Sequence, residues 1–258
     1  MTLRTTLLLA LLPLAACGGK EGDDTAATED TSMTGETGTT ETDVDPVHED
    51  NIEALYGAID VPGQLFLVTA MMAMGSGDCP VVVEAGTVTT ISGGCTDDDG
   101  NTLSGTVVAE EIGEGGTLTF SNWTIESGGD SVTVDGTATV DDNQALTSNF
   151  VVNGTAIEQE FLTPSITYSN FVQTDIMVTV MGSLGDNSNS GTMVAEGIDS
   201  FEVSGTQSEA EACDTVPDRA EIDLTGAVHS ISYSLNPDND CDPCVTWTHD
   251  GMTGEFCP

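Results

Sequence analysis

Hydrophobic residues recur at every second position through most of this chain. In residues 132–140, valine and alanine alternate with threonine and aspartate. A period of two places the apolar side chains on one face, which is typical of an antiparallel strand buried on one side. Similar runs are found at 81–83, 88–91, 103–108, 118–125, 146–152, 166–172, 176–181, 201–203, 222–224, 231–235 and 245–247.

Clusters of glycine, aspartate and asparagine separate these runs at spacings of roughly 8–12 residues. The spacing predicts an all-β fold, an antiparallel meander that forms a sandwich or an open up-and-down barrel. The apolar phase slips between Phe120 and Trp123, which predicts a β-bulge at the two residues between them. We find no strict internal repeat, which argues against a solenoid or propeller.

The period changes near the start of this β region. Apolar residues recur at helical spacing in 52–59 and again in 65–72. We therefore expect a short N-terminal helical segment over residues 47–76, divided at Pro62–Gly63, with Asp60 as the N-cap of the second piece. The methionine-rich second piece is expected to be core, with a lipid- or ligand-binding face as the alternative.

Residues 1–16 have the pattern of a secretory signal peptide. Arg4 precedes an apolar stretch that is shorter than the ~20 residues needed to span a membrane. The sequence Leu14-Ala15-Ala16-Cys17 resembles the lipobox of bacterial lipoproteins. This resemblance implies cleavage before Cys17 and lipid attachment to it, and Gly18 after it implies the outer membrane. No later segment is long and apolar enough to span, so the lipid anchor is the only membrane attachment we expect.

The lipidated Cys17 begins a tether of residues 17–46, rich in threonine, glycine and acids. Such a segment buries too little apolar surface to fold, and its like charges extend it. We expect a disordered spacer, with a surface-export signal as the alternative reading. Residues 47–258 are then one domain, helical over 47–76 and β over 79–258.

The charge of the chain is strongly unbalanced. It has 44 Asp and Glu against 3 Lys and Arg, a formal net charge of −41. Such a polyanion repels phosphate, which excludes nucleic acid and anionic lipid surfaces as partners. Arg219 is the only cation of the expected domain, and no nucleophile elbow, phosphate loop or zinc-protease motif occurs. We therefore expect a protein that is not an enzyme and has no resident cofactor.

Six cysteines remain once Cys17 is assigned to lipid. An even number in an exported chain predicts three disulfides, and we pair Cys79 with Cys95 because they flank one hairpin-like stretch. The others cluster late and are expected to staple the C-terminal hairpins, with a Cys₄ zinc site as the alternative. The remaining four are Cys213, Cys241, Cys244 and Cys257.

Two acidic stretches place oxygen ligands at alternate positions, as calcium-binding loops do. Neither completes an EF-hand, so polar turns are the competing interpretation, and adaptation to saline surroundings is a further reason for the acid excess. The candidate calcium ligands are Asp97, Asp99 and Asn101 in the first stretch and Asp238, Asp240 and Asp242 in the second.

His229 and His249 form a second candidate metal site. The segments 227–235 and 245–249 each carry an apolar face, and one register that matches these faces sets His229 opposite His249. Asp250 would then be a third ligand. The competing interpretation is that the two histidines merely end a hydrophobic face.

The acidic Gly/Thr/Asp-rich domain, the lipobox and Cys241-x-x-Cys244 with Cys257 resemble uncharacterised exported lipoproteins of myxobacteria. That group implies no particular activity. We expect a non-enzymatic envelope lipoprotein with a structural or binding role at the periplasmic or outer face of the outer membrane, with an unknown envelope or extracellular partner. The alternatives are a calcium-dependent adhesion or ligand-binding module and a hydrolase that uses clustered carboxylates.

Overall fold

The structure, a computed structural model, describes residues 49–74, 78–98, 100–111, 115–154, 165–174, 187–208, 219–236 and 244–257. The expected signal peptide and tether, with Cys17, lie outside this part of the chain. So does the strand expected at 176–181. Within the described part, two helices, α2 (Glu49–Ala58) and α3 (Val61–Met74), precede the strands.

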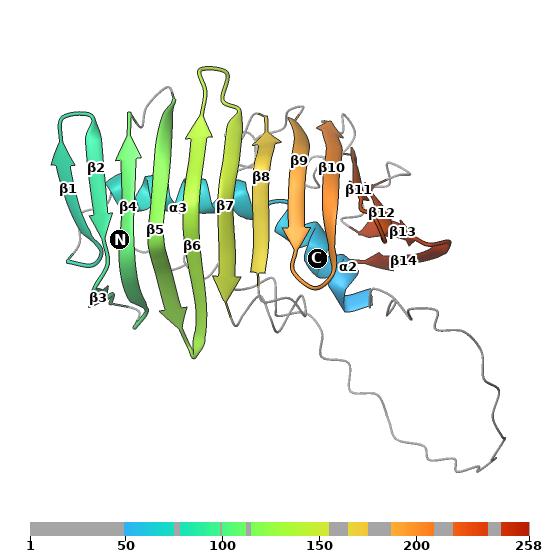
Figure 1. The fold of residues 1–258 in the computed structure, drawn as a ribbon, viewed down its shortest axis with the longest axis horizontal. Helices are drawn as coiled ribbons and strands as arrows, with labels where there is room; N and C mark the ends of the chain where they lie inside the picture. The colour runs from blue at the N-terminus through green and yellow to red at the C-terminus, as the bar shows by residue number, and fades with distance from the viewer. Residues whose placement is uncertain are drawn as a thin grey trace, which may run out of the picture.

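Fourteen strands of the described residues form one antiparallel sheet in which chain neighbours pair, apart from the short β3, which lies beside β4 off the main path (Figure 1). The expected meander is confirmed. The strands are β1 (Val81–Ala85), β2 (Val88–Ser92), β3 (Cys95–Thr96), β4 (Thr102–Glu110), β5 (Gly116–Ser127), β6 (Asp130–Val140), β7 (Leu146–Gly154), β8 (Ser165–Gln173), β9 (Asn187–Ala195), β10 (Asp199–Ser208), β11 (Arg219–Thr225), β12 (Ser230–Leu235), β13 (Val245–His249) and β14 (Met252–Phe256).

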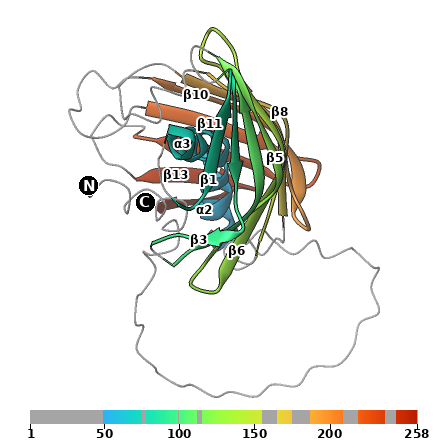
Figure 2. The ribbon, with the colours of Figure 1, turned by 90° about the vertical axis from the view of Figure 1, so that its left-hand side faces the viewer.

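The sheet is open and curved, and it wraps around both helices (Figure 2). The sandwich alternative is therefore wrong, because the helices take the place that a second sheet would occupy. Leu55 of α2 and Leu65 of α3 are buried, and the expectation that the methionine-rich helix belongs to the core holds for most of its length. Met71 of α3 is exposed.

The break between the helices lies one turn earlier than the sequence indicated. It falls at Ile59–Asp60, and Pro62 and Gly63 lie inside the first turn of α3. Proline is tolerated there because the N–H groups of the first turn have no acceptor within the helix, so the absence of an N–H on proline removes no helical hydrogen bond. Asp60 begins α3 as expected, since its carbonyl accepts the first helical hydrogen bond, from the Gln64 N–H at 3.1 Å.

Buried polar side chains of the sheet tie α2 to the concave face. The Tyr168 hydroxyl donates to the Ala58 carbonyl at 2.7 Å, and the Tyr233 hydroxyl donates to the Ile52 carbonyl at 2.7 Å. The Gln173 side-chain amide donates to the Ile59 carbonyl at 3.1 Å. The Ala58 and Ile59 carbonyls lie at and just after the end of α2, where they lack an intrahelical donor, and the Ile52 carbonyl gains an additional donor. The three bonds therefore fix where the helix lies on the sheet.

Aromatic side chains form a continuous row under the helices. The ring centroids of Phe120 and Phe150 are 6.0 Å apart, those of Phe150 and Tyr168 are 5.1 Å apart, and those of Tyr168 and Phe171 are 5.4 Å apart. These are favourable tilted and edge-to-face distances. The row therefore joins strands β5, β7 and β8 into one packed layer.

The predicted bulge between Phe120 and Trp123 is confirmed, because the β5–β6 register shifts there. The same local pattern recurs at unequal spacing, so it does not form a strict repeat in the sequence. Ser-Asn-aromatic triplets at 121–123, 148–150 and 169–171 each approach a glycine of positive φ on a neighbouring strand; these glycines are Gly105, Gly136 and Gly191.

These glycines are required by close backbone approach. A Cβ atom at Gly105 would overlap the Asn122 carbonyl, and one at Gly191 would lie 2.5 Å from the Asn170 carbonyl oxygen. The register shifts at both places. A β-bulge beside a glycine bends the sheet at that point. The recurring bulges therefore account for part of the curvature with which the sheet encloses the helices.

We predict that Tyr168→Phe lowers the free energy of unfolding by about 1–2 kcal/mol, because it leaves the buried Ala58 carbonyl without its donor. Urea denaturation of the purified chain measures this. Tyr56→Phe is the matched control, since no hydrogen bond of its hydroxyl is found among the described residues; it is expected to cost less. Equal losses in the two variants would contradict the role given to the Tyr168 hydroxyl.

Asp60 gives the helix junction a pH dependence. Burial raises the pKa of the Asp60 carboxyl from 3.8 to about 6. The folded state therefore holds its proton more tightly than the unfolded state. The cost of ionising the group in place begins above about pH 4 and is complete above about pH 6.

We predict that Asp60→Asn stabilises the fold by up to about 3 kcal/mol at pH 8 and changes little at pH 3.5. Asparagine has nearly the same shape as aspartate and is equally suited to this position at the start of a helix, so the substitution removes the charge with little other change. Thermal unfolding of both proteins across this pH range measures the difference. A gain that is independent of pH would refute the account.

Candidate functional site

His229, His249 and Asp250 meet at one end of strands β12 and β13. His249 ends β13, and Asp250 and Gly251 form the two-residue turn to β14, with φ angles of 49° and 82°. Positive φ at both positions is the pattern of a type I′ hairpin turn, for which Asp-Gly is a preferred sequence. His229 directly precedes β12.

The predicted register of β12 and β13 is wrong by two residues. The structure pairs Ile231 with His249 and Tyr233 with Trp247. The two imidazoles nevertheless lie together, with His229 Nδ1 and His249 Nε2 3.2 Å apart and ring centroids 5.3 Å apart. His229 shares a face with Ile231, so it is the diagonal neighbour of His249, and diagonal neighbours are within reach of long side chains.

The three side chains place one ligand atom each toward a common point. His249 Nε2 lies 3.3 Å from Asp250 Oδ2, and all three ligand atoms lie within 4.8 Å of one another. His229 is 5% exposed and His249 1% exposed, whereas the Asp250 side chain is 60% exposed. The cluster is thus buried on the histidine side and open to solvent on the carboxylate side.

The surroundings of His249 favour its neutral form, which has a lone pair to offer. Burial lowers the pKa of His249 below its ordinary value; the Asp250 carboxylate opposes this, and His229 adds to it. His249 is therefore neutral at pH 7. Its other ring nitrogen, Nδ1, is buried without a hydrogen-bond partner among the described residues.

Asp199, which the sequence analysis did not single out, holds His229 in place. Its Oδ2 accepts hydrogen bonds from the N–H groups of Val228 at 2.8 Å and His229 at 2.9 Å. Partial burial raises the pKa of Asp199, but the backbone donors, His229 first, outweigh it and the pKa lies below its usual value. No local motif marks this residue, because its partners are about thirty positions away in the chain.

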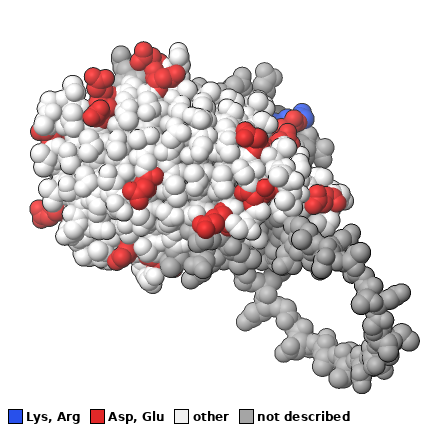
Figure 3. Space-filling view, in the orientation of Figure 1, with Lys and Arg blue, Asp and Glu red and all other residues white. Residues whose placement is uncertain are grey.

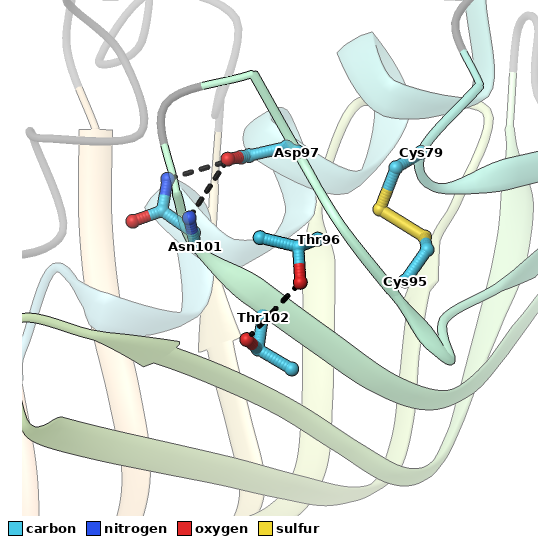
Figure 4. Close-up of a disulfide and its surroundings, with 6 residues drawn as sticks. All are labelled: Cys79, Cys95, Thr96, Asp97, Asn101 and Thr102. Atoms are coloured by element: carbon cyan, nitrogen blue, oxygen red, sulfur yellow. Dashed lines mark hydrogen bonds between the residues drawn. A yellow bond between two sulfur atoms is a disulfide. The ribbon is translucent and has the colours of Figure 1, made fainter.

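The first candidate calcium loop is organised as a polar turn (Figure 4). The Asp97 carboxylate accepts hydrogen bonds from the Asn101 backbone N–H at 2.8 Å and from its side-chain amide at 3.0 Å. Asp97 and Asn101 therefore already bind each other. Asp99 lies outside the described residues, as do all three candidates of the second loop, Asp238, Asp240 and Asp242.

Two disulfides lie near the two ends of the sheet. Cys79 bonds to Cys95, the pairing that the sequence predicted, and Cys244 bonds to Cys257 (Figure 4 shows the first). The Cys₄ zinc alternative is not supported, since Cys244 and Cys257 are joined to each other and offer no thiolates. Cys213 and Cys241 lie outside the described residues.

A shallow depression of about 480 Å³ lies beside the β9–β10 turn. Two carboxylates line it, Glu196 and Asp199, and both are engaged: Glu196 accepts a hydrogen bond from the Ser165 hydroxyl at 2.7 Å, and Asp199 holds the turn before β12. This pair of carboxylates does not support the hydrolase alternative, because both groups accept hydrogen bonds that hold the neighbouring turns.

Carboxylates are spread over the outer face of the sheet (Figure 3). Arg219, the one cation of the described residues, pairs with Glu221 at 2.8 Å. In the part of the chain that the structure covers, no single helix is both long and apolar enough to cross a membrane; α2 and α3 pass that test only together, as a pair bent by 48°.

No family model, curated protein or solved structure matches the chain. The assignment of a function therefore depends on the sequence and on the geometry described above.

We predict that Asp199→Asn lowers the free energy of unfolding at pH 7 by about 1–3 kcal/mol, since the carboxylate accepts charge-assisted bonds from several backbone donors. Because the folded pKa is depressed, this contribution is present above about pH 4 and is lost as the pH falls through the folded pKa. Denaturant unfolding at pH 7 and pH 3 measures it. Asp223→Asn is the control, since that carboxylate accepts one exposed hydrogen bond, from the Ser232 hydroxyl, which an amide oxygen can also accept; a loss as large in the control would contradict the assignment.

Proposed function

We propose that this chain is an exported, lipid-anchored protein of the bacterial cell envelope, placed at the outer membrane, with a binding rather than a catalytic role. The observation that carries the proposal is the pair of disulfides near the two ends of the sheet, Cys79–Cys95 and Cys244–Cys257. Structural disulfides are typical of exported proteins. This agrees with the lipobox at Cys17 and with the resemblance to myxobacterial exported lipoproteins.

The binding role is supported by what the sheet leaves accessible. Both helices fill the concave face, so the apolar interior serves the fold. The carboxylates of the depression beside β9 and β10 are engaged in hydrogen bonds. Two groups of described side chains bring potential ligand atoms together with solvent access: His229, His249 and Asp250, and Cys244, Glu255 and Cys257. The two cysteines of the second group are joined in a disulfide, so the histidine cluster is the better candidate for binding. A tether of residues 17–46 would hold this domain away from the membrane surface.

We predict that Cys17→Ser removes the protein from the membrane fraction, because the serine side chain cannot receive the lipid. Fractionation of cells that produce each form, followed by immunodetection, measures this. The control is Cys79→Ser together with Cys95→Ser, which keeps Cys17 and is expected to stay with the membranes. If the Cys17→Ser form still fractionates with membranes at the level of the original protein, lipid anchoring is wrong.

A further inference from the structure

We infer that His229, His249 and Asp250 bind one divalent transition-metal ion, of which zinc is the representative. This deepens the proposed binding role by naming its ligand. The register that the sequence predicts for the two histidines is wrong, but the observed contact of 3.2 Å between their ring nitrogens brings them together directly.

Two of the three separations between the ligand atoms match the edges of a tetrahedral site, and the third is no longer than 4.8 Å. Nitrogen and oxygen ligands lie about 2.0–2.1 Å from zinc, so neighbouring ligand atoms of a tetrahedron are about 3.3 Å apart. The observed separations are 3.2 Å between the two imidazole nitrogens and 3.3 Å between His249 Nε2 and Asp250 Oδ2. A tetrahedral ion would therefore require the His229 and Asp250 ligand atoms to lie about as close to each other as each lies to His249 Nε2.

The three facing atoms of the cluster, two imidazole nitrogens and one carboxylate oxygen, offer more lone pairs than there are protons to bind them. When both rings are neutral, the 3.2 Å contact between His229 Nδ1 and His249 Nε2 has room for at most one proton. If His229 Nδ1 carries it, His249 Nε2 accepts it and offers no donor to the Asp250 oxygen at 3.3 Å; if His249 Nε2 carries it, His229 Nδ1 and Asp250 Oδ2 share it. At most one proton therefore lies among three electron-pair donors, whereas a divalent cation attracts all three.

The kind of ligand selects the kind of metal. Imidazole nitrogen suits zinc, copper, nickel and cobalt, while calcium and magnesium take oxygen ligands in larger numbers. Two of the three ligand atoms here are imidazole nitrogens, so the hard cations are poor occupants. Asp250 is mostly exposed, and a fourth position therefore faces solvent, as in zinc sites with three protein ligands.

The site is held by rigid neighbours. Asp199 fixes the backbone at His229, and the type I′ turn fixes Asp250 next to His249. Ile231, which pairs with His249, is fully buried in the core. The ligand atoms are thus largely preorganised, and the ion would bind without ordering a loop.

The test is a titration of the purified full-length chain in detergent, freed of metal by a chelator, with zinc chloride in millimolar calcium. Because calcium in excess occupies the exposed carboxylates, only a site with nitrogen ligands is expected to take up zinc. We expect one zinc ion per chain with a dissociation constant in the micromolar range or below. We expect His229→Gln, His249→Gln and Asp250→Asn each to weaken binding about tenfold or more.

Two matched variants test the assignment. His48→Gln changes the third histidine of the chain, which lies outside the described residues, and Asp142→Asn changes an exposed turn aspartate far from the cluster in sequence. Both are expected to bind zinc as the original chain does. Because His249 is buried, circular dichroism of each variant without metal checks the fold, and Asp250→Asn, on an exposed turn, keeps the test valid if His249→Gln unfolds.

The visible absorption of bound cobalt is a second measurement, and it would not appear if the three side chains had only a structural role. Tetrahedral cobalt with nitrogen ligands absorbs visible light strongly, and we expect this band in the original chain and not in the Asp250→Asn or double-histidine variants. The inference is overturned if zinc does not bind, if millimolar calcium abolishes binding, or if binding survives replacement of both histidines. Failure here leaves the membrane fractionation of the Cys17→Ser form unaffected, so the two proposals fail separately.

Discussion

The fold depends on the packing of two short helices against the concave face of an open sheet. A single sheet has one face of alternating apolar side chains, and that face must be covered to keep it from water. Here α2 and α3 cover it, and the hydroxyls of Tyr168 and Tyr233 donate to carbonyls of α2 at 2.7 Å. Without the helices, the aromatic row of the concave face would be open to solvent.

The same constraint explains the outer face and the location of the candidate site. Because the apolar residues of each strand point to the helices, the alternate residues point outward, and they are mostly threonine, serine, asparagine and acids. His229 directly precedes β12 and His249 ends β13, and both lie on the face of Ile231, which is buried in the core. A polar cluster at the rim of an otherwise apolar layer combines buried nitrogen ligands with access to solvent.

Much of the fold follows from the period of two, and the exceptions have physical causes. The strand at Asn187–Ala195 was missed because its first half is Asn, Ser and Gly, which read as turn residues. The strand at Met252–Phe256 was missed because it lies at the sheet edge and is largely exposed. The helix break was misplaced because proline reads as a breaker, although it is tolerated in a first turn.

The candidate site was predicted only in part. The proximity of His229 and His249 follows from matching apolar faces, but the loop between β12 and β13 is too long to fix a register, and the predicted one was wrong. Asp199 was invisible in the sequence because it acts across distant segments on backbone N–H groups, which any residue type supplies.

Native-state hydrogen exchange tests the central claim most directly. If the helices hold the open sheet, then the amides of α2 near Leu55 open only with the whole domain, and their free energy of exchange equals that of the central strands β5 to β8. That equality is what the account predicts. If the α2 amides exchange with a much lower free energy while β5 to β8 stay fully protected, the sheet is stable without its helices and the account is contradicted.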